Sequence, residues 1–171
     1  MTKRNQMYRL LWSLVWFCLA RPFPRSSFNR WKTFLLRLFG ASIDSTAAVY
    51  STANVYMPCN LKMGPYSCLA GEVDCYNVAP VLIGANVTIS QKSYLCTASH
   101  DIYDSRHALI TSPIIIEDQV WVGASSFIGM GVTLKQGAVV GAMAAVFKNV
   151  DEWSVVGGNP AKFLKHRIIK E

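Results

Sequence analysis

An aliphatic side chain recurs every six residues through most of this chain, a spacing that fits neither an α-helix nor an ordinary β-strand. The clearest register keeps its phase over six positions, namely Ile116, Val122, Ile128, Leu134, Val140 and Val146. A short fixed period of this kind is typical of a solenoid. Each hexad would supply a short strand and a tight turn, and neighbouring coils would pair the backbone groups. We therefore expect a parallel β-helix.

The same spacing continues toward the N-terminus, clearly over residues 83–95 and more weakly over residues 43–81. Leu95 and Ile116 are 21 residues apart, which is not a multiple of six. A segment must leave the coil between them. The sequence predicts a β-helix over residues 42–156 with a loop protruding at about residues 97–113, and such loops often carry function.

Different patterns flank the repeat. Residues 1–41 form a basic and aromatic segment, in which we expect helices over 7–20 and about 27–39, separated by Pro22 and Pro24. Ser26 or Ser27 would cap the second helix. The apolar run at 10–20 is too short to cross a bilayer as a straight helix. Residues 157–171 predict a closing turn followed by a short basic helix over 163–170.

The net charge of +7 comes entirely from the N-terminal segment. Eight basic residues and no acidic one lie within residues 1–43, against nine basic and ten acidic residues in the remainder. The segment could cap the open end of the solenoid, or residues 7–39 could contact anionic lipid peripherally at the inner membrane. Nucleic acid is not an expected partner. Five cysteines without a Cys-x-x-Cys pair favour free thiols and a cytoplasmic location.

The register of the repeat and three further stretches carry a family resemblance. The aliphatic-Gly-x-x-x-x register and the closing Gly-Gly-Asn-Pro-Ala-Lys at 157–162 resemble the hexapeptide-repeat acyltransferases. Residues 30–41 and 89–101 are similar to the colanic-acid biosynthesis acetyltransferases within that family. The resemblance implies a left-handed β-helix with triangular coils and a homotrimer with active sites between subunits. It also implies acetyl-CoA as co-substrate and a sugar hydroxyl of a surface polysaccharide, built on a lipid or free, as acceptor.

His100 is the candidate catalytic base. An alcohol is a weak nucleophile at neutral pH, and an imidazole, with an unperturbed pKa near 6.5, can take its proton. His100 lies where the repeat breaks, and Thr97-Ala-Ser-His100 matches the family's pattern around the catalytic histidine. Asp101 would cap the loop, while Glu117 and Asp118 are alternative residues to orient the imidazole. No third partner accompanies His100 and His107, so we expect no metal.

The resemblance also indicates residues for the two substrates. Glu72, Asp74 and Asn77 occupy the segment that holds the acceptor in related sugar acetyltransferases, although they could equally be turn residues. For acetyl-CoA, Ala124 and Ala142 match corner positions where the pantetheine arm approaches, and Trp121 would form the wall of the groove. Lys148, Lys162 and Arg167 would meet the phosphates of CoA.

Two alternatives stay open at this stage. The acceptor could be an amino sugar or a small alcohol or drug instead of a polysaccharide sugar. The chain could also be a non-catalytic solenoid scaffold, although that alternative does not explain the loop histidine or the cluster of basic residues near the C-terminus.

Overall fold

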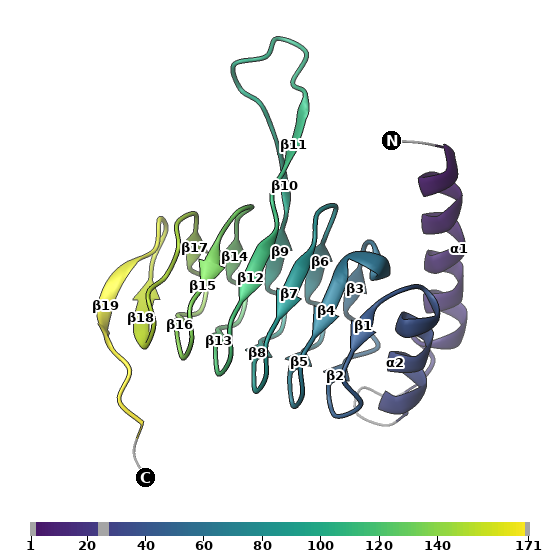
Figure 1. Ribbon diagram of the computed structural model, residues 1–171, viewed down its shortest axis with the longest axis horizontal. Helices are drawn as coiled ribbons and strands as arrows, with labels where there is room; N and C mark the ends of the chain where they lie inside the picture. Colours follow the sequence, from purple (N-terminus) through teal and green to yellow (C-terminus); the bar gives the residue numbers. More distant parts are fainter. Residues whose placement is uncertain (1–2, 24–27, 170–171) are drawn as a thin grey trace.

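The computed structural model describes residues 3–23 and 28–169, which form a left-handed parallel β-helix with two helices at its N-terminal end (Figure 1). Three sheets, parallel throughout except for the terminal strand β19, make the three faces of a prism. Sheet A contains β1 (Ser42–Ile43), β4 (Leu61–Met63), β7 (Val81–Ile83), β12 (Ile114–Ile116) and β15 (Thr133–Leu134). Sheet B contains β2 (Ala48–Val49), β5 (Cys68–Leu69), β8 (Thr88–Ile89), β13 (Trp121–Val122), β16 (Val139–Val140), β18 (Ser154–Gly157) and β19 (Lys162–His166). Sheet C contains β3 (Asn54–Val55), β6 (Asp74–Tyr76), β9 (Tyr94–Cys96), β14 (Phe127–Ile128) and β17 (Ala145–Val146).

The aliphatic repeat forms the core, as predicted. Val122, Ile128, Leu134 and Val140 are all fully buried, and their counterparts in the earlier coils are buried to 7% exposure or less. Because each short strand turns one aliphatic residue inward per hexad, the prism has a continuous apolar interior.

The weaker N-terminal register has a structural explanation. Ser42 pairs with Lys62, so the first coil takes 20 residues, whereas Ile115 pairs with Thr133 after 18. The two extra residues of the first coil lie at the corner between sheets C and A, where the 3-10 helix η1 (Pro58–Asn60) is inserted before β4. This insertion shifts the hexad phase without interrupting the stacking.

The N-terminal helices cover the first coil. Helix α1 (Lys3–Leu19) places Trp12 and Trp16 against its open end, where the two indole N–H groups donate to the carbonyls of Val55 at 2.7 Å and Ala53 at 3.0 Å. Helix α2 (Asn29–Leu38) packs on β1 and β2. The helices therefore protect an edge that would otherwise expose unpaired backbone groups.

Two details of the helices differ from the sequence prediction. Helix α1 begins at Lys3 and α2 at Asn29, where Phe28 occupies the N-cap position in the left-handed region with φ of 59°. The predicted capping residues Ser26 and Ser27 lie outside the described residues. None of the described helices is both long and apolar enough to cross a membrane.

The predicted C-terminal helix is wrong. Residues 162–166 form β19, which pairs antiparallel with β18. Strand β18 follows the last full coil and would otherwise leave an open edge, so the returning chain pairs with it in place of forming a solvated helix. The basic, amphipathic appearance of this segment misled the prediction because all five residues of β19 are exposed.

Candidate active site

A β-hairpin projects from the prism between β9 and β12 and carries His100 near its tip (Figure 1). Its strands, β10 (Ala98–His100) and β11 (Leu109–Thr111), are antiparallel, with His100 opposite Leu109. At its base the N–H of Ser112 donates to the carbonyl of Thr97 at 3.0 Å, and the Thr97 hydroxyl donates to the carbonyl of Tyr76 at 3.0 Å. The hairpin is thus anchored to the corner between sheets C and A.

Two aspartates shape the tip. Asp101 Oδ1 accepts the N–H of Tyr103 at 2.9 Å, and Asp104 Oδ1 accepts the N–H of Arg106 at 2.9 Å. The hydrogen bonds from the backbone N–H and the side chain of Arg106 hold the pKa of Asp104 below its usual value. The predicted role of Asp101 as a loop cap is therefore confirmed.

His100 is oriented by the main chain. Its Nδ1 lies 2.5 Å from the carbonyl oxygen of His107. A carbonyl can only accept, so Nδ1 must carry the proton and the neutral imidazole keeps the lone pair of Nε2 free. His107 has φ of 49°, in the left-handed region, within the turn that directs its carbonyl at His100. Both imidazoles are exposed to solvent.

The two carboxylates suggested as alternative orienting groups have other partners. Glu117 Oε2 accepts the N–H of Gln136 at 2.8 Å, and Asp118 Oδ1 accepts the N–H of Ala85 at 2.7 Å. Both carboxylates join neighbouring coils at the corner between sheets A and B, so that suggestion is wrong. Side-chain chemistry gave no signal for the true orienting group, because it is a backbone carbonyl.

The corner between sheets B and C brings together three of the predicted residues. Glu72, Ala124 and Ala142 lie in turns that are stacked along this corner, and backbone hydrogen bonds link successive turns. At one end of the row the N–H of Lys92 donates to the carbonyl of Gly71, and at the other end the N–H of Met143 donates to the carbonyl of Ala124 at 2.8 Å. The coils are tightly stacked here, since a Cβ on Gly123 would come within 2.6 Å of the Ala142 nitrogen. We call this row of turns the small-residue edge.

Trp121 stands on β13 of sheet B, the strand that leads directly into that edge. Its indole is half exposed, and its Nε1–H donates to the Ser90 hydroxyl at 3.0 Å. It pairs across the sheet with Thr88 and Val139. A flat aromatic surface thus borders the small-residue edge.

Lys148 and Lys162 line one cavity of about 400 Å³ at the C-terminal end of the prism. Phe147, Pro160 and Phe163 form its apolar wall, and Asp151 also lines it. Asp151 is already paired with Lys135 at 2.8 Å. The cavity therefore joins two exposed ammonium groups to apolar walls, which suits an anionic group with an attached ring system.

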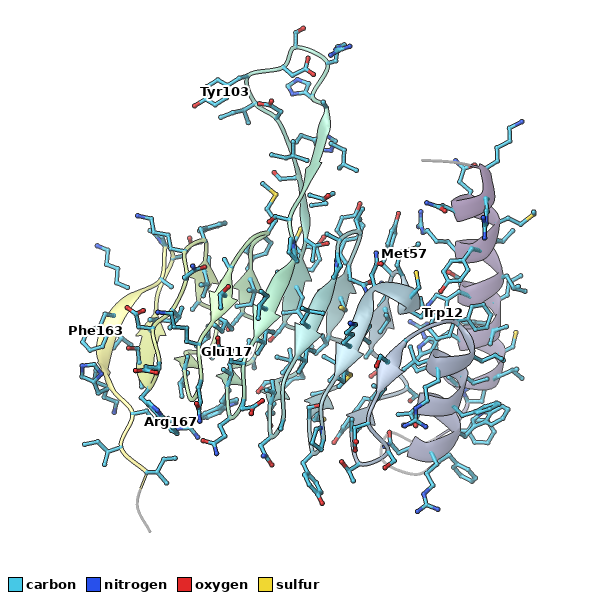
Figure 2. The ribbon with its side chains drawn as sticks, viewed as in Figure 1. Trp12, Met57, Tyr103, Glu117, Phe163 and Arg167 are labelled. Atoms are coloured by element: carbon cyan, nitrogen blue, oxygen red, sulfur yellow. The ribbon has the colours of Figure 1, made fainter. Side chains whose placement is uncertain are left out.

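Arg167 does not join these lysines, which corrects its predicted place at the phosphates. Its Nη1 donates to the carbonyls of Gln119 at 2.7 Å and Gly137 at 3.1 Å, and its guanidinium lies 5.9 Å from the centroid of the Trp153 ring. Figure 2 shows Arg167 at the C-terminal end of the prism. Arg167 thus fastens the C-terminal segment to the corner between sheets A and B. Sequence proximity to Lys162 was misleading because β19 reverses the chain direction.

The predicted acceptor residues are separated by the fold. Asn77 is fully buried, and its side chain bonds both the N–H of Met57 at 2.8 Å and the carbonyl of Met57 at 2.7 Å. Its amide serves the corner beside η1 and is not open to a sugar, so the structure does not support its predicted contact. Asp74, on sheet C, accepts the Asn54 amide at 3.0 Å, and Glu72 faces Lys92 at 4.0 Å on the surface.

Within one chain, then, the hairpin and the small-residue edge occupy two different corners of the prism. The hairpin that carries His100 leaves the prism at the corner between sheets C and A (Figure 1), whereas Ala124 and Ala142 lie at the corner between sheets B and C. Among the described residues, no group of three or more His, Cys, Asp and Glu side chains is arranged to hold a metal ion.

Comparison with known proteins gives a consistent family signal. Residues 113–146 match a family model described as the hexapeptide repeat of succinyl-transferase. The chain is 39% identical over 142 residues to the putative colanic acid biosynthesis acetyltransferase WcaF of Escherichia coli K12, covering 83% of this chain and 78% of that protein.

Solved structures share the fold over nearly the whole chain. A hexapeptide-repeat containing acetyltransferase of Vibrio cholerae, complexed with acetyl coenzyme A, is 26% identical with a TM-score of 0.84, over 98% of this chain and 91% of that one. A maltose O-acetyltransferase of Clostridium difficile 630 is 22% identical with a TM-score of 0.85, over 98% of this chain and 90% of that one. At that identity the second likeness shows the fold alone.

Proposed function

The chain belongs to the hexapeptide-repeat acetyltransferases, and from this we propose that it transfers the acetyl group of acetyl-CoA to a hydroxyl of a sugar in a surface polysaccharide. The observation that carries the proposal is the histidine held on the hairpin with Nε2 free. The similarity to the colanic acid protein over most of the chain supports a polysaccharide sugar as the acceptor class.

His100 would act as the general base. Its Nε2 takes the proton of the sugar hydroxyl as that oxygen attacks the thioester carbonyl. The carbonyl of His107 accepts from Nδ1–H and stabilises the imidazolium that forms. His100 then returns the proton to the sulfur that leaves, so the products are a sugar acetyl ester and CoA, and no covalent enzyme intermediate is needed.

Acetyl-CoA would lie along the small-residue edge. The thioester is the activated acyl group that the reaction consumes. Ala124 and Ala142 leave room for an extended arm to approach the backbone, and Trp121 gives a flat wall on the sheet B side. Lys148 and Lys162 would neutralise the phosphates in the cavity at the C-terminal end. The Vibrio cholerae relative, solved with acetyl coenzyme A, supports this donor.

A homotrimer would complete the site. The hairpin that carries His100 leaves the prism at a different corner from the small-residue edge of its own chain, so a neighbouring copy would present that edge to the hairpin. Closed rings of identical subunits are common in soluble oligomers, and a head-to-tail contact is what a three-fold ring requires. The cysteines are all free, which fits a reducing compartment, and we place the reaction in the cytoplasm.

Analysis of the product with the purified protein tests this function. The protein is incubated with acetyl-CoA whose acetyl group is labelled and with deacetylated surface glycan, and the glycan is examined by mass spectrometry before and after mild alkali. If a sugar ester forms, the glycan gains the mass of the labelled acetyl group and loses it again in mild alkali. An alkali-stable amide would instead indicate an amino sugar, and transfer only to a small alcohol or drug would overturn the polysaccharide acceptor. Absence of both acetyl-CoA binding and transfer would leave the scaffold alternative.

A further inference from the structure

Helix α1 carries apolar side chains on two opposite faces. Trp12, Trp16 and Ala20, the last just beyond its C-terminal end, face the solenoid and are buried. The helical period places a second set on the other side, between 54% and 72% exposed, consisting of Met7, Leu10, Leu11, Leu14 and Phe17. A helix that only capped the prism would need one apolar stripe and would turn polar residues to solvent. Capping therefore does not account for the outer stripe.

Helix α2 extends this apolar surface. The exposed residues Trp31, Phe34 and Leu38 repeat at helical spacing, and the rings of Trp31 and Phe34 stack with centroids 5.8 Å apart. Trp31 Nε1–H donates to the carbonyl of Leu19 at 2.7 Å, which joins α2 to the end of α1. We call these three residues and the outer stripe of α1 the end-face patch, because both helices stand at the N-terminal end of the prism (Figures 1 and 2).

The charges around the end-face patch select its partner. Residues 1–43 contain eight basic residues and no acidic one. Lys3, Arg4 and Arg30 are exposed on these helices, and Arg21 is exposed in the turn after α1. An anionic surface complements them, whereas a second copy docked face to face would set cations against cations. Exposed Trp, Phe and Leu together with Arg and Lys is the composition of a helix that lies in a lipid headgroup layer.

We propose that the end-face patch binds the surface of an anionic bilayer, with α1 lying in the plane of the headgroups. Helix α1 runs across the end of the prism, so the solenoid would stand upright on the membrane (Figure 1). The hairpin leaves the third coil, and two coil spacings plus the width of one helix put its base roughly 20 Å from that surface. This height suits a sugar acceptor carried on a lipid headgroup. That role for membrane binding rests on the proposed function, whereas the binding of the end-face patch to the bilayer does not depend on it.

Vesicle flotation measures the binding directly. The full chain is mixed with phosphatidylcholine vesicles that contain or lack phosphatidylglycerol, at low and at high salt, and centrifuged through a density gradient. We expect the protein to float with the anionic vesicles, less with neutral ones, and less at high salt. Equal recovery at the bottom of the gradient under all conditions would overturn the proposal.

Matched variants locate the contact. The triple change Leu11→Gln, Leu14→Gln and Phe17→Gln should lower partitioning into anionic vesicles about tenfold or more, because the buried apolar area is lost. Ile168→Gln, at an exposed apolar position near the C-terminus, should leave partitioning unchanged. Circular dichroism confirms that each variant is folded.

Two further readouts separate the competing explanations. Acetyl transfer to a water-soluble acceptor should be equal in the triple variant and the wild type, so failure of membrane binding and failure of the proposed function are distinguishable. If the triple change reduces the molecular mass measured by sedimentation but leaves flotation intact, the end-face patch is a subunit contact and the membrane proposal is wrong.

Discussion

At the scale of single residues, the main chain holds the candidate base, because His100 Nδ1 donates to the carbonyl of His107. A histidine at a break in the repeat can be recognised in the sequence. Its hydrogen-bond partner cannot, because that partner is the backbone carbonyl of His107 and every residue has a backbone carbonyl. The ligand contacts predicted for Asn77 and Arg167 are not supported, for a related reason. Both side chains could hydrogen-bond to a ligand, but in the structure they form hydrogen bonds to backbone groups of neighbouring coils. In a stacked solenoid the corners expose many such backbone groups, so polar residues near corners are often structural.

The two pocket lysines and Arg167 should respond differently to neutralisation. Lys148→Gln with Lys162→Gln should raise the KM for acetyl-CoA about tenfold with little change in kcat, because charge-assisted contacts to phosphate are lost. The KM for acetyl-pantetheine, which lacks the nucleotide, should not change. Arg167→Gln is the matched control, and we expect it to lower the free energy of unfolding by about 1–2 kcal/mol and leave both KM values intact. Equal effects of all three changes on KM would contradict these assignments.

Tyr8 should make the fold sensitive to alkali. Burial, followed by the influence of Cys59, raises the pKa of Tyr8 from 10.0 to about 12, and its hydroxyl donates to the carbonyl of Phe39. The folded state therefore keeps a proton that the unfolded state releases, so this contribution to stability is complete below pH 10 and is lost as the pH rises toward 12. Urea unfolding across this range should show a shallower decline in Tyr8→Phe than in the wild type. An identical slope in both proteins would contradict the assignment.

At the scale of elements, the repeat predicted the coils because hydrophobic spacing and backbone pairing are the same constraint in a solenoid. Each aliphatic position of the clear six-residue registers falls in a strand, and the break between Leu95 and Ile116 marks the hairpin. The segment after the last coil was different. Its residues are all exposed, so no burial pattern distinguished helix from strand, and the open edge of β18 decided the outcome. The sequence of this segment does not show that it will meet the unpaired edge of β18, so its strand conformation could not be predicted.

The hairpin should be separable from the stability of the solenoid. Replacing residues 100–109 with an Asn-Gly turn joins Ser99 to Ile110, which already face each other, and keeps the Ser112–Thr97 hydrogen bond at the base. We expect a melting temperature within a few degrees of the wild type, since the removed residues are exposed or only partly buried, together with complete loss of acetyl transfer. Thermal unfolding followed by circular dichroism and a thiol-release assay check the two outcomes. Loss of folding would show that the hairpin is part of the structural core.

At the scale of the whole molecule, the chain is a prism in which different segments cover the two ends and one corner bears the hairpin. The N-terminal helices close one end, the C-terminal segment closes the other, and the hairpin extends one corner away from the small-residue edge (Figure 1). Composition separated the N-terminal segment from the repeat, but only the coordinates show that α1 is apolar on both of its faces. The proposed sharing of the site between subunits rests on the hairpin and the small-residue edge lying at different corners of one prism, which no spacing in the sequence reveals.

The cap should stabilise the entire solenoid. Trp12 fills the open end of the first coil and donates to the carbonyl of Val55 at 2.7 Å, so Trp12→Ala should lower the free energy of unfolding by about 3–5 kcal/mol. Leu11→Ala, on the outer stripe of the same helix, should change it by less than about 0.5 kcal/mol. Chemical denaturation compares the two. Similar losses in both variants would mean that the outer stripe is also part of the folded core.

The most direct test of the central claim compares His100→Ala with His166→Ala in a single-turnover acetyl transfer at saturating acetyl-CoA. Both histidines are exposed, and only His100 lies on the hairpin with its Nδ1 held by the carbonyl of His107. We expect His100→Ala to lose at least about a hundredfold in rate, with acetyl-CoA affinity largely retained, and His166→Ala to match the wild type. A His100→Ala protein that still transfers acetyl groups at the wild-type rate would contradict the account.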